Sequence, residues 1–243
     1  MSKESREERR LRRLEARVGR DESKLASYRR FAIWGGGLVL LAVLAFMAVK
    51  FASPSSTPSS KDIVPAPISA EDWLEGPENA PYTLLEYSDF ECPACRAVQP
   101  MLKEVLGKMS GKIRFVYRHF PLKMVHSDSL LAARAAEAAG KQGKFWEMHD
   151  VLFDKQDEWV QAKDGPESFF KAYAEQLGLD PNRFQADYQS KEIITKIDAA
   201  YDTALKLGLD HTPTFFVNGR LIENPRDANE LEASIQGSAP VTQ

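Results

Sequence analysis

The feature that most constrains the fold is the placement of the only two cysteines of the chain, in the run Cys92-Pro93-Ala94-Cys95. Two cysteines this close in sequence cannot cross-link distant parts of a chain, so a disulfide-stapled miniprotein is excluded. The fold must instead rest on a hydrophobic core. With 243 residues, of which 43% are hydrophobic, the chain is long enough to bury one main domain.

The same run has a chemical consequence. A Cys-Pro step that enters a helix places Pro93 in the first turn, where its missing N–H costs nothing. Cys92 then lies beside free amide donors and the positive end of the helix dipole, and both favour a thiolate. Cys95 follows one helical turn later, close enough to form a small disulfide loop with Cys92.

A zinc half-site is the alternative reading of a C-x-x-C pair, and it requires two further ligands. Carboxylates apart, the chain offers four histidines, none of them at ligand spacing to another: His119, His126, His149 and His211. We therefore expect neither a metal nor another cofactor.

Charge is distributed unevenly along the chain. Residues 1–30 carry eleven Lys or Arg against six Asp or Glu, a net charge of +5, which leaves −8 for the remainder. Phe31–Val49 is an uncharged run of nineteen residues. This pattern predicts a membrane-spanning helix over residues 31–50, a cytoplasmic segment 1–30 attracted to anionic membrane lipid rather than to nucleic acid, and an extracytoplasmic remainder.

A cleavable signal peptide is the alternative for this N-terminal part. Its charged region would be unusually long, and Lys50 interrupts the small-residue pattern near Ala52. We therefore predict a single-pass anchor in the cell membrane. Residues 51–68, rich in Ser and Pro, follow as an extended linker, and the folded domain is expected over residues 69–243.

Within the domain, the hydrophobic pattern predicts a strand at Tyr82–Ser88, a helix from Cys92 to about Lys108 and a strand at Lys112–Tyr117. Such a strand, helix and strand form a right-handed crossover. The cysteines would lie at the carboxyl end of the first strand, where open α/β sheets place their reaction sites.

The pattern then becomes helical over about residues 126–208 and returns to strands. Thr214–Val217 and Arg220–Ile222 flank Asn218-Gly219, the strongest signal for a two-residue hairpin turn. Asp227–Ile235 is expected to close the domain as a helix.

Four segments occur in an order typical of one family: Glu86-Tyr-Ser-Asp-Phe-Glu-Cys-Pro-Ala-Cys95, Arg118-His-Phe-Pro-Leu122, Gly143-Lys-Phe-Trp146 and Thr212-Pro-Thr-Phe-Phe-Val-Asn-Gly219. On these segments, about residues 70–236 resemble the DsbA-like thioredoxin-fold proteins. The resemblance implies an α/β thioredoxin fold, βαβ plus ββα, with a helical insertion between the halves. The predicted transmembrane helix would precede it.

The resemblance also implies roles for individual residues. Cys92 would be the exposed nucleophile, Cys95 the shielded resolving thiol, and Pro213 a cis proline that presents the backbone of Thr212 to substrates. Glu86 corresponds to the acidic residue beneath the cysteines, which implies proton traffic with Cys95. Its apolar neighbours favour burial and a raised carboxyl pKa.

The charges around the nucleophile leave its ionisation open. Asp89 and Glu91 precede Cys92 and oppose its anion, whereas Arg96, four residues beyond, is positioned to offset them. Ala94 stands where family oxidases often have a histidine. We expect packing or capping roles for His119, His126 and His149, a surface or site position for His211, and no catalytic role for any of them.

The sequence thus predicts a membrane-tethered, extracytoplasmic (periplasmic) thiol-disulfide oxidoreductase that oxidises exported clients through Cys92 and Cys95. An integral-membrane redox partner would re-oxidise the pair. Two alternatives use the same fold. One is a reductase or isomerase kept reduced by a membrane donor, and the other is a chaperone or binding module with idle thiols.

Overall fold

The computed structural model describes residues 46, 63–160 and 162–239. The predicted cytoplasmic segment 1–30, the membrane-spanning helix except for Phe46, and the linker up to residue 62 lie outside the described residues. Within the described part, no helix combines the length and the apolar character needed to cross a bilayer.

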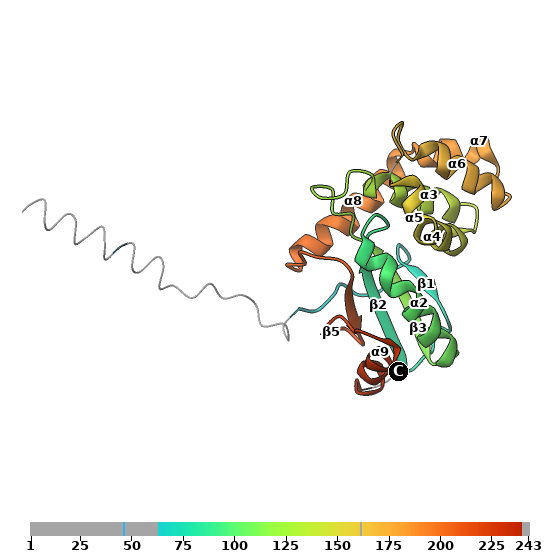
Figure 1. Cartoon of the computed structure of the whole chain (residues 1–243). Helices are drawn as coiled ribbons and strands as arrows, with labels where there is room; N and C mark the ends of the chain where they lie inside the picture. The colour runs from blue at the N-terminus through green and yellow to red at the C-terminus, as the bar shows by residue number, and fades with distance from the viewer. Residues whose placement is uncertain (1–45, 47–62, 161, 240–243) are drawn as a thin grey trace, which may run out of the picture. The chain divides into compact units, whose positions relative to one another are not determined.

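In the described part of the chain, five strands form one sheet in the order β1-β3-β2-β4-β5 (Figure 1). The strands are β1 (Trp73–Glu75), β2 (Tyr82–Ser88), β3 (Ile113–His119), β4 (Thr214–Val217) and β5 (Arg220–Ile222). Strands β2 and β3 are parallel, and the other neighbours are antiparallel. The parallel pair with helix α2 between its strands confirms the predicted crossover.

The helices follow the predicted order. They are α2 (Pro93–Lys108), α3 (Ser129–Gly140), α4 (Phe145–Asp154), α5 (Gln156–Trp159), α6 (Glu167–Gln176), α7 (Pro181–Tyr188), α8 (Lys191–Lys206) and α9 (Ala228–Gln236). Side-chain caps fix several starts, as at Asp180, which accepts from Arg183 N, and Ser190, which accepts from Ile193 N. Helices α3 to α8 form the helical insertion between β3 and β4.

The hairpin between β4 and β5 has the predicted ends and the predicted turn. Asn218 and Gly219 adopt φ angles of +49° and +77°, which a two-residue hairpin loop requires and which these residue types tolerate. The turn also ties the hairpin to its neighbour, because Thr83 N donates to Asn218 Oδ1 at 2.7 Å.

Two elements have no counterpart in the sequence prediction. Strand β1 spans only three residues and pairs antiparallel with β3, too short a run to show a period of two. Helix α5 spans four residues. Strand β3 also extends two residues beyond its predicted end, to His119, because it stays in register with β2 as far as Ser88.

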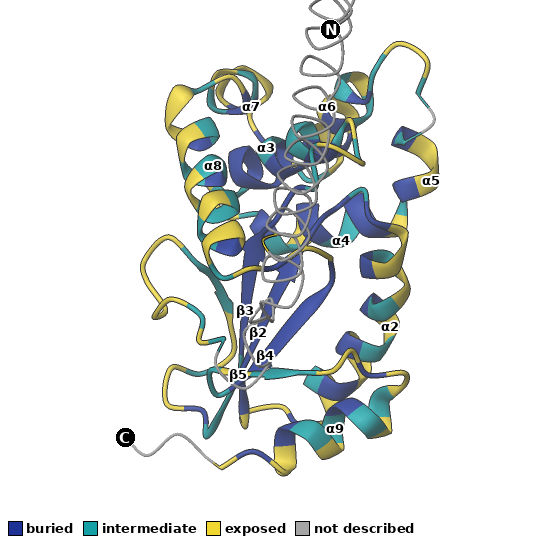
Figure 2. Ribbon diagram, turned by 90° about the vertical axis from the view of Figure 1, so that its left-hand side faces the viewer, coloured by how far each residue is buried: buried dark blue, intermediate teal, exposed yellow. Residues whose placement is uncertain are grey.

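Both faces of the sheet are covered by buried apolar side chains, and Figure 2 shows the central strands as mostly buried. One cluster joins the sheet to α2 and α9 through Leu84, Leu102, Val105, Phe115, Phe215, Val217, Leu231 and Ile235. Another includes Leu85, Val116, Phe120, Ala204, Leu209 and Phe216 and brings in α8. The largest cluster fills the helical insertion and includes Cys92 and Cys95. The cysteines therefore lie where the sheet meets the insertion.

Candidate active site

Helix α2 begins at the C-x-x-C run. Cys92 is its N-cap with extended backbone angles (φ −71°, ψ 120°), and Pro93 occupies the first turn. The Cys92 amide donates to Asp89 O at 3.1 Å, which closes the turn between β2 and α2. The sulfur of Cys92 thus lies at the N-terminus of a sixteen-residue helix, as the sequence predicts.

Both cysteines are free thiols and both are buried. The prediction that Cys92 is exposed is wrong, because Cys92 is only 6% exposed. Cys95 is fully buried, as the resemblance implies. Two segments that are distant in sequence form hydrogen bonds with Cys92. The Cys92 thiol donates to Thr212 O at 3.4 Å, and Gln156 Nε2 donates to Cys92 O at 3.1 Å.

The two thiols differ in acidity. Hydrogen bonding from the Cys95 thiol is the largest cause that lowers the pKa of Cys92, to about 5, and with the amides of Cys95 and Ala94 it outweighs the effect of burial. Burial is the main cause that raises the pKa of Cys95, with contributions from its hydrogen bond to Cys92 and from the charge of Glu86. The reduced pair therefore ionises at Cys92 and keeps its proton at Cys95.

Glu86 lies fully buried on β2. Its Oε1 accepts a hydrogen bond from Ser88 Oγ at 2.7 Å, while its Oε2 has no hydrogen-bond partner among the described residues. Burial raises the pKa of Glu86 to about 8, against the lowering effect of Ser88, and the charge of Cys92 raises it further. Near neutral pH, Glu86 is therefore a protonated acid that interacts electrostatically with both thiols.

The loop before β4 completes the site. The Thr212-Pro213 peptide is cis, as the resemblance implies. Thr212 is buried against Cys92, and Asn224 Nδ2 donates to Pro213 O at 2.8 Å. The residues predicted to bind substrate are therefore brought to the predicted nucleophile from the far end of the domain.

The charged neighbours of Cys92 pair differently from expectation. Arg96 does not offset Asp89 or Glu91, because its Nη1 pairs with Asp157 Oδ2 at 2.6 Å. Asp89 instead pairs with His126, whose Nδ1 lies 2.7 Å from Asp89 Oδ2. The sequence contains no local signal for these pairs, since each joins residues from separate elements.

The remaining histidines stand apart from the thiols. His211 is exposed and pairs with Asp210, so it does not enter the site. His119 and His149 are buried, and each has a carboxylate partner, Glu137 and Asp150 respectively. Among the described residues, no group of three or more His, Cys, Asp or Glu side chains is arranged to hold a metal ion.

A groove of about 480 Å³ opens beside the first turn of α2. It is lined by Glu91, Pro93, Arg96, Ala97, Pro100, Gln156, Asp157 and Val160. Helices α2 and α5 supply most of these residues. The unpredicted helix α5 thus contributes to this groove and, through Gln156, donates a hydrogen bond to Cys92 O.

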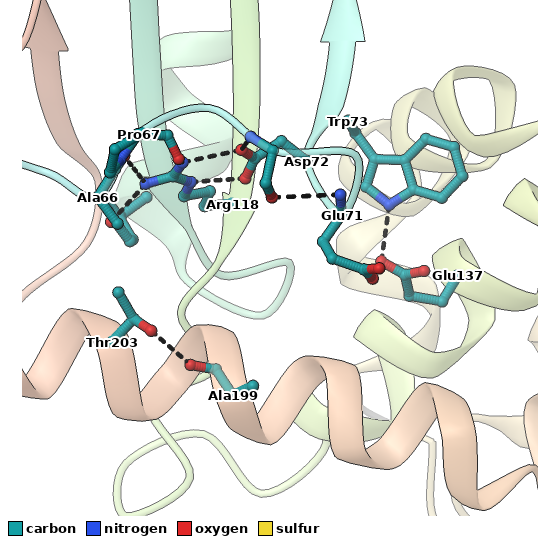
Figure 3. Close-up of polar contacts among 11 residues, drawn as sticks. Ala66, Pro67, Glu71, Asp72, Trp73, Arg118, Glu137, Ala199 and Thr203 are labelled. Carbon is teal, nitrogen blue, oxygen red and sulfur yellow. Dashed lines mark hydrogen bonds and ion pairs between the residues drawn. The ribbon is translucent and has the colours of Figure 1, made fainter.

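A second polar cluster lies around the segment that enters the domain (Figure 3). Arg118 forms a bidentate pair with Asp72 at 2.6 and 2.8 Å and donates to the carbonyls of Ala66 and Pro67. Nearby, Trp73 Nε1 donates to Glu137 Oε1 at 2.7 Å. These bonds fasten residues 66–73 to β3 and α3. None of the side chains that form them is a free nucleophile.

Comparison with known proteins agrees with this architecture. A family model described as thioredoxin matches residues 69–237. The Na⁺/H⁺ antiporter NhaA 3 of Salinispora tropica is 41% identical over 167 residues, which cover 69% of this chain but 24% of that protein. The chain thus spans about a quarter of the length of the curated relatives it matches.

Two solved structures extend the comparison. A thioredoxin-like oxidoreductase from Silicibacter pomeroyi superposes with a TM-score of 0.60 and 27% identity, covering 70% of this chain and 92% of that one. DsbA2 of Pseudomonas aeruginosa gives a TM-score of 0.54 and 26% identity, covering 71% and 95%. On the matched domain, the fold and the arrangement of its cysteines, the chain belongs to the thioredoxin family, with DsbA-like thiol-disulfide oxidoreductases among its structural relatives.

Proposed function

We propose that this protein is a thiol-disulfide oxidoreductase that oxidises pairs of cysteine thiols in exported proteins. The observation that carries the proposal is the unequal acidity of its two thiols. Cys92 has a pKa of about 5, whereas burial raises the pKa of Cys95 above its ordinary value. Such a pair opens and re-forms its disulfide by exchange at one defined sulfur, that of Cys92.

The reaction starts from the Cys92–Cys95 disulfide. A client thiolate attacks Cys92 Sγ, a new bond forms between the client and Cys92, and the sulfur of Cys95 leaves as a thiolate. Glu86, protonated near neutral pH, supplies the proton that this sulfur takes up. A second client thiolate then attacks the client sulfur, and Cys92 leaves as a thiolate. Two electrons pass from the client to the cysteine pair.

The acidity of Cys92 favours this direction. A thiolate that is stable at neutral pH stabilises the reduced protein and so makes its disulfide a stronger oxidant. After allowance for solvent screening, a pKa of about 5 corresponds to about 2 kcal/mol, or about 40 mV, at pH 7. The acidity arises although Ala94 supplies no hydrogen-bonding side chain between the cysteines.

The groove and the cis-proline loop support binding of an extended client segment. The groove beside α2 lies next to the covered sulfur, and the backbone of Thr212 contacts that sulfur. A segment that adds to this backbone edge would bring its cysteine to Cys92. Because Cys92 is only 6% exposed, productive binding must displace some of the residues that cover Cys92.

We further propose that residues 31–50 anchor the domain in the cell membrane, with the thiols on the extracytoplasmic side. An integral-membrane partner would accept the two electrons and restore the disulfide. The basic residues 1–30 and the uncharged run after them support this topology. In the matched antiporter, a similar domain belongs to the same chain as a membrane transporter, which is compatible with work at a membrane.

Redox equilibration of the full chain with glutathione tests the direction. We expect a reduction potential nearer −120 mV, the range of strong oxidants, than −270 mV, the range of reductases. A value near −270 mV would replace the oxidase proposal with the reductase or isomerase alternative. Fractionation of cells that express the full chain, with protease added to intact spheroplasts, tests the anchor and its orientation.

Trapping in cells tests the exchange itself. Cys95→Ala has no disulfide of its own, so its Cys92 thiolate captures a client by attacking a client disulfide, and one client sulfur leaves as a thiolate. Without the Cys95 thiol to attack the mixed disulfide in turn, these covalent complexes should accumulate. They should disappear in a Cys92→Ser and Cys95→Ala double variant, which is the matched control. If Cys95→Ala captures no client at all, the thiols are idle and the chaperone alternative gains.

A further inference from the structure

An acidic side chain lies in the turn that carries the nucleophile. Asp89 is buried, with its backbone oxygen bonded to the amide of Cys92 at 3.1 Å. Its carboxylate accepts from the amides of Glu91 and Leu122, each at 2.9 Å. An uncompensated negative charge at this place would oppose a thiolate at Cys92. Ala94 and Arg96 provide no compensation, since one is apolar and the other pairs with Asp157.

The loop between β3 and α3, residues 120–128, is tied directly to this turn. Leu122 N reaches Asp89 Oδ2, and Asp128 N donates to Glu91 Oε2 at 2.6 Å. Within the loop, His126 N donates to Leu122 O at 2.9 Å. Two hydrogen bonds between the loop and the turn, and one within the loop, thus fix the backbone position of His126.

The imidazole of His126 meets the carboxylate of Asp89. Nδ1 lies 2.7 Å from Asp89 Oδ2, with the His126 side chain 16% exposed and that of Asp89 fully covered. The hydrogen bond to Asp89 is the largest cause that raises the pKa of His126, and the charges of Asp89, Cys92 and Glu91 raise it further. Burial opposes the cation, but these three acidic groups outweigh it and favour the cationic form of the imidazole.

We propose that His126 is a positioning residue of the thiol site: as an imidazolium held by Asp89, it neutralises the buried carboxylate in the turn before Cys92 and so favours the Cys92 thiolate. This inference rests on the proposed function, because it concerns the same sulfur. It gives His126 a role beyond the packing or capping that the sequence predicts.

A reciprocal effect follows from linkage. If the imidazolium favours the thiolate, the thiolate must favour the imidazolium by the same free energy. His126 should therefore hold its proton to higher pH in the reduced protein than in the disulfide form, which has no thiolate. As pH rises through the pKa of His126, the cation is lost and Cys92 should become less acidic.

Alkylation kinetics on the reduced protein test the first half of the inference. The rate of reaction of Cys92 with iodoacetamide, measured against pH, reports its thiolate fraction. His126→Gln retains a donor for Asp89 but not the charge. We expect about threefold slower alkylation at pH 5, because one solvated charge pair changes the ionisation constant of Cys92 about fivefold and Cys92 is half ionised at its pKa of about 5. His126→Lys should restore most of the rate, and His211→Gln, at an exposed site, should leave it unchanged. Unchanged kinetics in a folded His126→Gln would overturn the inference.

Proton NMR of the unaltered protein tests the second half without any variant. The imidazole of His126 is titrated in the disulfide and in the dithiol form, with His211 as the internal control. A higher pKa of His126 in the dithiol form is expected, and equal values in the two forms would overturn the inference. Failure here, with mixed disulfides still captured by Cys95→Ala, would leave the proposed function standing. If His126 titrates as expected but Cys95→Ala captures no client, the inference about His126 stands and the proposed function fails.

Discussion

Two buried carboxylates of this domain behave in opposite ways. Glu86 on β2 and Glu137 on α3 are 0% and 1% exposed, yet the pKa of Glu86 is raised to about 8 and that of Glu137 is lowered to about 2. Burial raises the pKa in both cases, so burial does not explain the difference. The partners do.

Glu137 accepts from Trp73 Nε1, lies 3.0 Å from His119 Nε2 and pairs with Lys196 Nζ at 2.9 Å. Its hydrogen bond to His119, the charges of His119 and Lys196 and its bond to Lys196 together outweigh burial. Among the described residues, Glu86 has only the Ser88 hydroxyl as a hydrogen-bond partner. A fully paired carboxylate stays charged and holds structure together, whereas a poorly paired one keeps a proton that can be moved.

The largest effect is expected at the paired carboxylate. Glu137→Gln removes the negative charge and leaves Lys196 facing a neutral amide, so the protein should lose about 3 kcal/mol of unfolding free energy. Urea denaturation at pH 7 measures the loss. Glu175→Gln, on the exposed side of α6, is the control and should change stability by less than about 0.5 kcal/mol. Equal losses in both variants would contradict a structural role for Glu137.

The pH dependence should carry the signature of the lowered pKa. Glu137 is ionised in the folded protein down to about pH 2 but in an unfolded chain only above its ordinary value of 4.5. Its contribution is therefore complete above pH 4.5 and is lost as pH falls toward 2. The difference in free energy of unfolding between the wild type and Glu137→Gln should therefore narrow as pH falls from 4.5 toward 2.

The second largest effect is expected at Glu86, with the opposite sign. Because its pKa is raised from 4.5 to about 8, the folded protein holds a proton that the unfolded chain releases. Stability should fall by about 3 kcal/mol as pH rises from 5 to 8. Glu86→Gln should remove this fall. Denaturation of the disulfide form at pH 5 and pH 8 separates the effect of Glu86 from that of Cys92, because Cys92 has no thiol to titrate in the disulfide form. An equal fall in both proteins would contradict the burial of an ionisable Glu86.

Glu86→Gln should also slow exchange with a reduced client peptide, by about a hundredfold if Glu86 acts as the acid for Cys95. The pH profile of the rate should lose its inflection near 8, the pKa of Glu86. A variant that keeps both rate and profile would assign Glu86 to structure alone.

The smallest effect is expected at Ser88, the one residue in the described part of the chain that forms a side-chain hydrogen bond with Glu86. Ser88→Ala should cost about 1 kcal/mol and raise the pKa of Glu86 further, because this hydrogen bond lowers it. The inflection in the stability profile should therefore move to higher pH. Ser234→Ala, which removes a hydroxyl bonded to a backbone carbonyl in α9, should leave that inflection in place.

Much of the fold is predictable from sequence because it depends on local patterns. Tyr82–Ser88 and Thr214–Val217 have the predicted strand limits, α2 begins at Pro93, and Asn218-Gly219 forms the hairpin turn. Each depends on neighbours within a few residues: apolar periodicity, a proline in the first helical turn, or a residue that tolerates a positive φ. The short elements β1 and α5 lack such patterns and exist through their packing.

By itself, the sequence determined which residues the proposed chemistry would use: two cysteines at a helix N-terminus, a strand glutamate behind them and a proline loop of the right type. Only the tertiary structure decided their properties. Gln156 donates to Cys92 O, Asp89 is paired with His126, and Glu137 rather than Glu86 is paired with His119 and Lys196. The reason is physical. A pKa depends on charges and donors within a few ångströms, and these partners lie 18 to 64 residues apart in the chain.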